Sequence, residues 1–135
     1  MSCGFNTLDS EYRVIMENDV DLAKYKNELL PFKAGETIFK SDEPGDVMYL
    51  VTKGEVEILI HDKVIEEVGP GGVIGEMALL DNAPRSATAT AKTDCLLLSI
   101  DKERFQAQVT KSPSFALQVM RIMAERLRRV DKFIS

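Results

Sequence analysis

The sequence predicts a mainly β domain, a roll or barrel of short strands flanked by helices. Its 135 residues suffice for one domain with a single core. From Leu29 onward, short runs rich in β-branched residues alternate with turn residues at about every six to ten positions. After Asp101 the apolar residues return to helical spacing. The economical arrangement of these elements is a β-roll with helices on its outside.

A helical segment is expected before the β-rich region. Residues 8–27 mix apolar and charged positions without Gly or Pro, which favours one or two short helices, and Asp9 or Ser10 can cap the first. The chain therefore divides into an N-terminal helical segment, residues 1–28, and a principal domain, residues 29–135.

Strand-like runs fill the β-rich region, and glycine-containing turns such as Pro44-Gly45 and Lys53-Gly54 separate them. The runs are TIFK (37–40), DVMYLVTK (46–53), EVEILIH (55–61), KVIEEV (63–68), SATATAKT (86–93) and DCLLLSI (94–100). The last is apolar enough to be buried on both faces. We expect about seven or eight short strands in all.

Two helices are expected after these strands. Asp101 is a suitable N-cap for a helix that runs toward Lys111. Ser112 then caps a second helix with Pro113 at its first position, where the missing N–H costs nothing. The apolar residues at helical spacing in this second helix are Phe115, Val119, Ile122, Met123, Leu127 and Val130.

Composition and charge exclude several classes of function. No apolar run approaches the roughly 18 residues of a membrane span, and the first residues do not form a secretion signal. The net charge of −5 argues against a nucleic-acid partner, and the mixed basic stretch 121–132 is too short to replace a reading helix. Cys3 and Cys95 indicate free thiols in a reducing compartment. We expect a cytoplasmic protein with no membrane or nucleic-acid partner.

The segment GGVIGEMALLDNAPRSATATA, residues 71–91, has the features of an anion site. A glycine-rich turn leads into a short helix whose first N–H groups lack internal partners. Arg85 can pair with an anion in bidentate fashion, whereas Glu76 suits a ligand that has hydroxyl groups to donate. Singly, Glu76, Arg85 and Ser86 each have an ordinary structural explanation. Their combination indicates a nucleotide that carries a single phosphate charge.

The stretch GEMALLDNAPRSATATA closely resembles the phosphate-binding cassette of cyclic-nucleotide-binding domains, the modules of kinase regulatory subunits, bacterial catabolite activators and cyclic-nucleotide-gated channels. PFKAGETIFKSDEPGDVMYLVTKGEVEI is similar to the first strands of that family, and the closing helices are similar to its B and C helices. The resemblance extends from Leu29 to Ser135. It implies a double-stranded β-helix, a jelly-roll or cupin-like barrel, with an N-terminal helix and C-terminal B and C helices.

The resemblance also implies roles for the residues of the cassette. Glu76 would accept a hydrogen bond from the ribose 2′-hydroxyl, and Arg85 would pair with the cyclic phosphate. The other contributions would come from the Ser86 hydroxyl, from the backbone N–H groups of Met77, Ala78 and Ala87, and from Gly75, which would allow close approach.

The last helix would supply the cover of the base. Arg126 stands where a capping residue would stack on the purine, and Arg129 and Phe133 are alternatives. The hydroxyl of Ser86 suits both cyclic nucleotides, and we expect cAMP in preference to cGMP.

The expected function is that of a sensor or regulatory domain, in which a cyclic nucleotide binds reversibly and the C-terminal helix moves in response. No further cofactor is implied.

The alternative is an interaction or dimerisation domain that retains the fold without the ligand, because the last helix could equally pack on a second copy. A downstream protein partner is expected but the sequence does not identify it. Within these 135 residues the resemblance is to a stand-alone, bacterial-type member; in a longer protein the output segment would lie outside them.

The sequence lacks the features of a metal-dependent enzyme of similar fold. Metal-dependent cupins bind their metal through clusters of His and Glu, whereas this chain has a single histidine, His61, in an expected hairpin. No pair of nucleophile and base is visible either. We therefore expect no catalytic residue, no metal site and no enzymatic activity.

Overall fold

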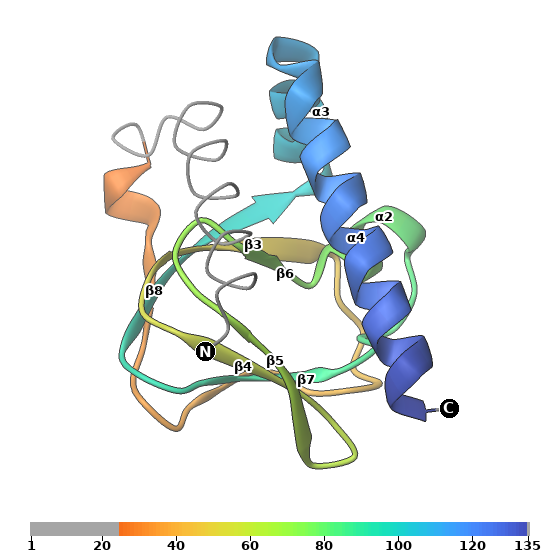
Figure 1. Cartoon of the computed structure of the whole chain (residues 1–135). Helices are drawn as coiled ribbons and strands as arrows, with labels where there is room; N and C mark the ends of the chain where they lie inside the picture. The colour runs from red at the N-terminus through yellow and green to blue at the C-terminus, as the bar shows by residue number, and fades with distance from the viewer. Residues whose placement is uncertain (1–24, 135) are drawn as a thin grey trace.

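The computed structural model describes residues 25–134, apart from the side chains of Lys26 and residues 129–134. Within these residues, eight strands form two four-stranded antiparallel sheets, and helices lie along one side of them (Figure 1). The first sheet has the order β1 (Leu30–Phe32), β8 (Cys95–Asp101), β3 (Val47–Lys53), β6 (Val73–Ile74). The second has the order β2 (Thr37–Phe39), β7 (Thr88–Ala91), β4 (Val56–Ile60), β5 (Lys63–Val68). The helical elements are the 3₁₀ turn η1 (Lys26–Glu28) and the helices α2 (Glu76–Asp81), α3 (Lys102–Lys111) and α4 (Pro113–Ile134).

This arrangement confirms the mainly β fold with flanking helices. Each of the six strand-like runs contains a strand, and β1 and β6 are additional. β1 contains Pro31, which is tolerated because this strand lies at an edge and pairs with β8 alone. β6 has two residues, too few to show alternation. The helices expected within residues 8–27 lie outside the described residues, except for the start of η1.

β7 is shorter than the expected run, since Ser86 and Ala87 precede it. The preceding residue, Arg85, pairs through its backbone with the loop before β3: its N–H donates to Glu43 O at 2.8 Å, and its O accepts from Asp42 N at 2.8 Å. The backbone of the expected anion-binding arginine is therefore fixed against residues that lie far from it in the sequence.

Two apolar cores share the strands β3 and β8. One core fills the space between the two sheets, and the other lies between the first sheet and the helices. β8 places Leu97 in the first core and Leu98 in the second, and β3 divides Val51 and Leu50 in the same way. This division confirms that the DCLLLSI strand is buried on both faces.

The hairpin between β4 and β5 turns at His61 and Asp62, both with positive φ, 51° and 66°. A two-residue loop of this kind matches the twist of the flanking strands. His61 is exposed at this turn, as the sequence predicts.

The two C-terminal helices begin as expected. Asp101 Oδ1 accepts from the backbone N–H of Arg104 at 2.8 Å, which confirms the N-cap of α3, and Pro113 is the first residue of α4. The buried residues of the α4 stripe are Phe115, Val119 and Ile122. Leu127 departs from the stripe, because it is 58% exposed. Along the described side chains of α4, the last residues of the core cluster beneath the helix are Ile122 and the half-buried Met123. The side chain of Val130 lies outside the described residues.

Candidate functional site

A cavity of about 190 Å³ lies between α2, the second sheet and α4. Much of its wall is apolar and includes Ile58, Ile60, Ile65, Ile74, Met77 and Leu127. All eight residues that the sequence singles out line this one cavity: Gly75, Glu76, Met77, Ala78, Arg85, Ser86, Ala87 and Arg126. Their roles toward a ligand remain predictions.

Gly75 makes the close approach at the start of α2 possible. It precedes the helix in the left-handed conformation, with φ of 77°, which favours glycine. A Cβ atom at this position would lie 2.4 Å from Arg85 Nη1 and 3.3 Å from the ring of Phe39. The turn therefore needs glycine for its backbone and also for its neighbours.

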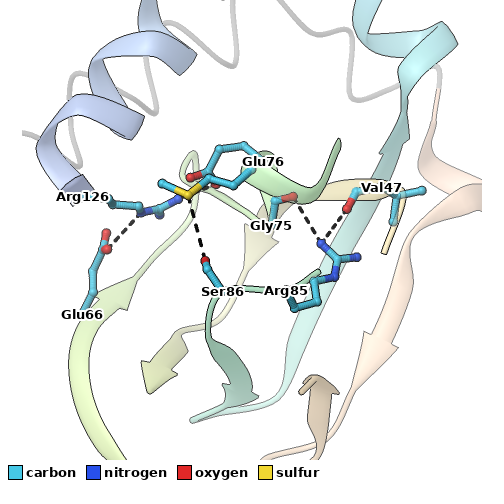
Figure 2. Close-up of polar contacts among 8 residues, drawn as sticks. Val47, Glu66, Gly75, Glu76, Arg85, Ser86 and Arg126 are labelled. Carbon is cyan, nitrogen blue, oxygen red and sulfur yellow. Dashed lines mark hydrogen bonds and ion pairs between the residues drawn. The ribbon is translucent and has the colours of Figure 1, made fainter. Parts of the chain in front are cut away.

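Arg85 is a buried cation, 5% exposed, whose guanidinium lies beneath the start of α2. Its Nη1 donates to the backbone oxygens of Val47 at 2.9 Å and Gly75 at 3.2 Å (Figure 2). The guanidinium carbon lies 4.2 Å from the ring centre of Phe39, a cation–π distance. Among the described residues, its Nε is a buried donor without an acceptor. The head group is thus held in place while part of its hydrogen-bonding capacity is unused.

The pKa of Arg85 is lowered from its ordinary value because burial disfavours the charged form. The acidic groups around it, Tyr49, Asp46, Glu43 and Glu76, act in the opposite direction. A guanidinium of this kind remains charged at neutral pH. An anion in the cavity could therefore pair with a cation that is already partly desolvated.

Arg126 reaches from α4 to two carboxylates. Its Nη1 donates to Glu76 Oε1 at 2.6 Å, and its Nε donates to Glu66 Oε1 at 2.9 Å. Figure 2 shows the guanidinium of Arg126 between Glu66 of β5 and Glu76 at the start of α2. Although burial disfavours the charge, Glu76 and Glu66 raise the pKa of Arg126 above its ordinary value. The residue expected to cover the base therefore lies in an ion pair with the residue expected to bind the ribose.

Ser86 is exposed and lines the cavity, and its Oγ lies 4.0 Å from Met77 Sδ. A contact with a thioether at that distance is weak, so the hydroxyl can take another partner. The alternative base-covering residues, Arg129 and Phe133, have side chains outside the described residues.

Several residues that line the site were not expected there from the sequence, and Glu66 and Phe39 are the two that contact its arginines. Glu66, the second partner of Arg126, lies beside Glu67 in a strand, so the alternation indicates that one of the two faces inward, but it does not indicate Arg126 as the partner. The contact of Phe39 with Arg85 could not be predicted, because an apolar residue in a short strand indicates only a core position.

The described residues contain no group of three or more His, Cys, Asp or Glu side chains placed to hold a metal ion. Among the described helices, none combines the length and apolar character needed to cross a membrane.

Residues 29–112 match the family model of the cyclic nucleotide-binding domain, which is more than half of the chain. The chain belongs to the cyclic nucleotide-binding domain family. The match contains every expected site residue except Arg126, which lies beyond its end.

Two curated relatives of this cyclic nucleotide-binding domain are named as regulators. A cAMP-dependent protein kinase regulatory subunit of Eremothecium gossypii is 37% identical over 116 residues, which are 86% of this chain and 24% of that protein. A CRP-like cAMP-activated global transcriptional regulator of Mycobacterium tuberculosis is 30% identical over 109 residues, 77% of this chain and 49% of the regulator. The crystal structure of the Thermus thermophilus catabolite activator protein has a TM-score of 0.69 at 32% identity and covers 87% of this chain and 57% of that chain. The chain thus spans between about a quarter and about half of the two curated relatives.

Proposed function

We propose that this domain binds a cyclic nucleotide reversibly, with cAMP preferred to cGMP, and that α4 reports whether the site is occupied. The observation that carries the proposal is the meeting of two buried charges of opposite sign, Glu76 and Arg85, at one largely apolar cavity. A cyclic nucleotide brings one phosphate charge, ribose hydroxyls and a flat base, and each has a counterpart there. The names of two relatives, which refer to cAMP, support the choice of nucleotide.

In the proposed complex, Arg85 pairs with the cyclic phosphate and Glu76 accepts a hydrogen bond from the ribose 2′-hydroxyl. The Ser86 hydroxyl and the N–H groups of Met77, Ala78 and Ala87 complete the phosphate site. Met77 and Ala78 lie in the first turn of α2, where N–H groups are free to bind an anion. The isoleucine-rich wall formed by β4 and β5 receives the base.

The proposed response of α4 depends on Arg126. Its guanidinium binds the Glu76 carboxylate that the ribose would also use. A ligand that changes this ion pair therefore changes the free energy of α4 in its present position, which is the requirement for a ligand-driven shift. In this proposal Arg126 also covers the base, as expected from the resemblance, once the nucleotide is bound.

A homodimer through α4 is a second proposal. Three exposed apolar side chains follow one face of this helix at spacings of three and seven residues: Leu117, Met120 and Leu127, which are 55%, 57% and 58% exposed. With Ala124, also exposed, they give the 3-4-3 spacing of a helix–helix seam. Such a face suits a second copy of the same helix, and it would also serve an interaction domain that binds no nucleotide.

The test is titration calorimetry of the whole chain with cAMP and then cGMP. We expect a micromolar affinity for cAMP, about −8 kcal/mol, and weaker binding of cGMP. Arg85→Ala should lower the affinity for cAMP by about a hundredfold, since the phosphate loses its charged partner. Arg128→Ala is the matched control, because Arg128 is an exposed arginine paired with Glu125 on the same helix turn.

Two outcomes would contradict the proposal. One is a wild-type chain that gives neither heat nor a melting shift with either nucleotide at millimolar concentration, which would favour the interaction domain. The other is an Arg85→Ala variant that binds as well as Arg128→Ala. Chromatography of the nucleotide after incubation checks the absence of catalysis, since a binding module returns it unchanged.

A further inference from the structure

We propose that Gly45 is a positioning residue for Arg85, because only a residue without a side chain leaves space for the buried guanidinium. Gly45 lies outside the cassette, in the loop that precedes β3. The steric part of this inference concerns the ligand-free chain. Its consequence for ligand affinity rests on the proposed function.

The guanidinium of Arg85 is closely packed against Gly45. A Cβ atom built on Gly45 would lie 2.2 Å from Nε, 2.5 Å from Cζ and 2.7 Å from Nη2 of Arg85. Real Cβ atoms essentially never show contacts below 3.0 Å. On the other side, a Cβ atom on Gly75 would lie 2.4 Å from Nη1. The head group therefore fits between two glycines and above the ring of Phe39.

The backbone gives no reason for glycine at position 45. The glycines with positive φ are Gly35, Gly54, Gly71 and Gly75, and Gly45 is not among them. An alanine at position 45 is therefore compatible with the backbone conformation, and the three nearest atoms that its Cβ would meet all belong to Arg85. Gly75 differs, since its φ of 77° and its neighbours both demand glycine.

The conflict would be relieved at the arginine rather than at the loop. The loop is fixed by two backbone hydrogen bonds to Arg85, through Asp42 N and Glu43 O. The guanidinium, in contrast, is the far end of a flexible side chain. Its displacement would break the bonds from Nη1 to Val47 O and Gly75 O and remove it from Phe39. Gly45→Ala is therefore expected to keep the fold and to lose the position of the phosphate-binding group.

A first experiment needs no ligand. The Nε–H of Arg85 is buried, so its NMR signal should be resolved and slow to exchange with water, and Arg85→Lys assigns it by removing it. In Gly45→Ala the signal should shift and exchange faster by at least about tenfold. Gly69→Ala is the matched control: Gly69 also lacks a positive φ, and the three nearest atoms that a Cβ there would meet belong to the movable Glu55 carboxylate, the first at 3.1 Å. An Arg85 signal that is unchanged in Gly45→Ala would overturn the proposal.

A second experiment measures cAMP affinity by calorimetry. Gly45→Ala should bind about tenfold more weakly than Gly69→Ala, while the two unfold at similar temperatures. In an Arg85→Lys background the same change should cost less than about twofold, because the lysine ammonium lacks the planar Nε–Nη2 edge. An equal loss in both backgrounds would show that Gly45 acts without Arg85, and would overturn the proposal.

The remaining outcomes are also decisive. If Gly45→Ala fails to fold, the double variant with Arg85→Ala must restore folding, because it removes the clashing group; a double variant that stays unfolded contradicts the proposal. If the wild-type chain binds no cyclic nucleotide, the proposed function fails, and the NMR comparison alone decides the role of Gly45.

Discussion

Arg126 and Glu76 form an ion pair of 2.6 Å that joins the last helix to the first residue of α2. Their side chains are 12% and 4% exposed, so the pair is largely removed from water. Glu66 of β5 is bound to the same guanidinium at 2.9 Å. Through the Arg126 side chain, α4 is therefore bound to both β5 and α2, two of the elements that line the candidate nucleotide site.

Arg126→Ala should destabilise the chain by about 3 kcal/mol, because it removes the cation from a buried ionic group and leaves Glu76 without its charged partner. Two carboxylates, Glu66 and Glu76, would then lie close together without the guanidinium between them. Urea unfolding followed by circular dichroism measures the free energy of unfolding. Arg128→Ala, which removes an exposed arginine from the same helix, should change it by less than about 0.5 kcal/mol. Equal stability of the two variants would refute the structural role of Arg126.

The local part of the site could be predicted from the sequence. Gly75, Glu76 and Arg85 lie within one short segment, and glycine, acid and arginine in that pattern have few joint explanations outside a ligand site. The β-rich runs could be predicted for the same reason, since alternation and turn residues are visible within a few positions. The strand β6 could not be predicted, because two residues are too few to show alternation.

The long-range part of the site could not be predicted. Arg126 and Glu66 are 60 positions apart, and nothing in either neighbourhood indicates the other. In the sequence, Gly45 looks like an ordinary turn residue after Pro44. The need for glycine there becomes visible only in the structure, where the Arg85 guanidinium packs against it. Leu127 fits the apolar period of α4, but the period does not tell where the underlying core ends.

The exposed face of α4 predicts self-association. Leu117→Lys combined with Met120→Lys should shift the chain toward the monomer, since two charges would face each other across a helix–helix seam. Sedimentation equilibrium measures the change. Ala107→Lys, at an exposed position of α3, is the control and should leave the association constant unaltered. A wild-type chain that is monomeric at high concentration would contradict the dimer but not the nucleotide site.

Cys95 should be unreactive in the folded chain. Burial raises the pKa of its thiol, and the one S–H donor is shared between the backbone oxygens of Glu55 and Thr93, each 3.2 Å from Sγ. In a Cys3→Ser variant, a thiol reagent should react at least about a hundredfold more slowly with the native than with the unfolded chain. Rapid reaction of the native thiol would contradict the described burial.

The same thiol should make stability depend on pH. A folded-state pKa above the unfolded value gives a contribution that is fully present below the unfolded pKa, about 8.5, and is lost as pH rises above it. The free energy of unfolding of Cys3→Ser should therefore fall more between pH 8 and 10 than that of the control Cys3→Ser/Cys95→Ala. Parallel curves for the two variants would rule out this contribution.

Glu76 and Glu66 share Arg126, and a ligand that lacks one hydroxyl can separate their roles. The wild-type chain should bind 2′-deoxy-cAMP about tenfold more weakly than cAMP, because the Glu76 carboxylate would lose its donor. Glu76→Ala should bind both nucleotides weakly and about equally. Glu66→Ala is the matched control: it also removes one carboxylate from Arg126, yet it should keep the tenfold preference.

Calorimetry with both nucleotides on the wild-type chain and the two variants tests this assignment of Glu76. If Glu66→Ala loses the preference and Glu76→Ala keeps it, the ribose is bound at β5 and the assignment of Glu76 is wrong. If both lose it, the ion pair itself, rather than the Glu76 carboxylate alone, sets the recognition of the hydroxyl.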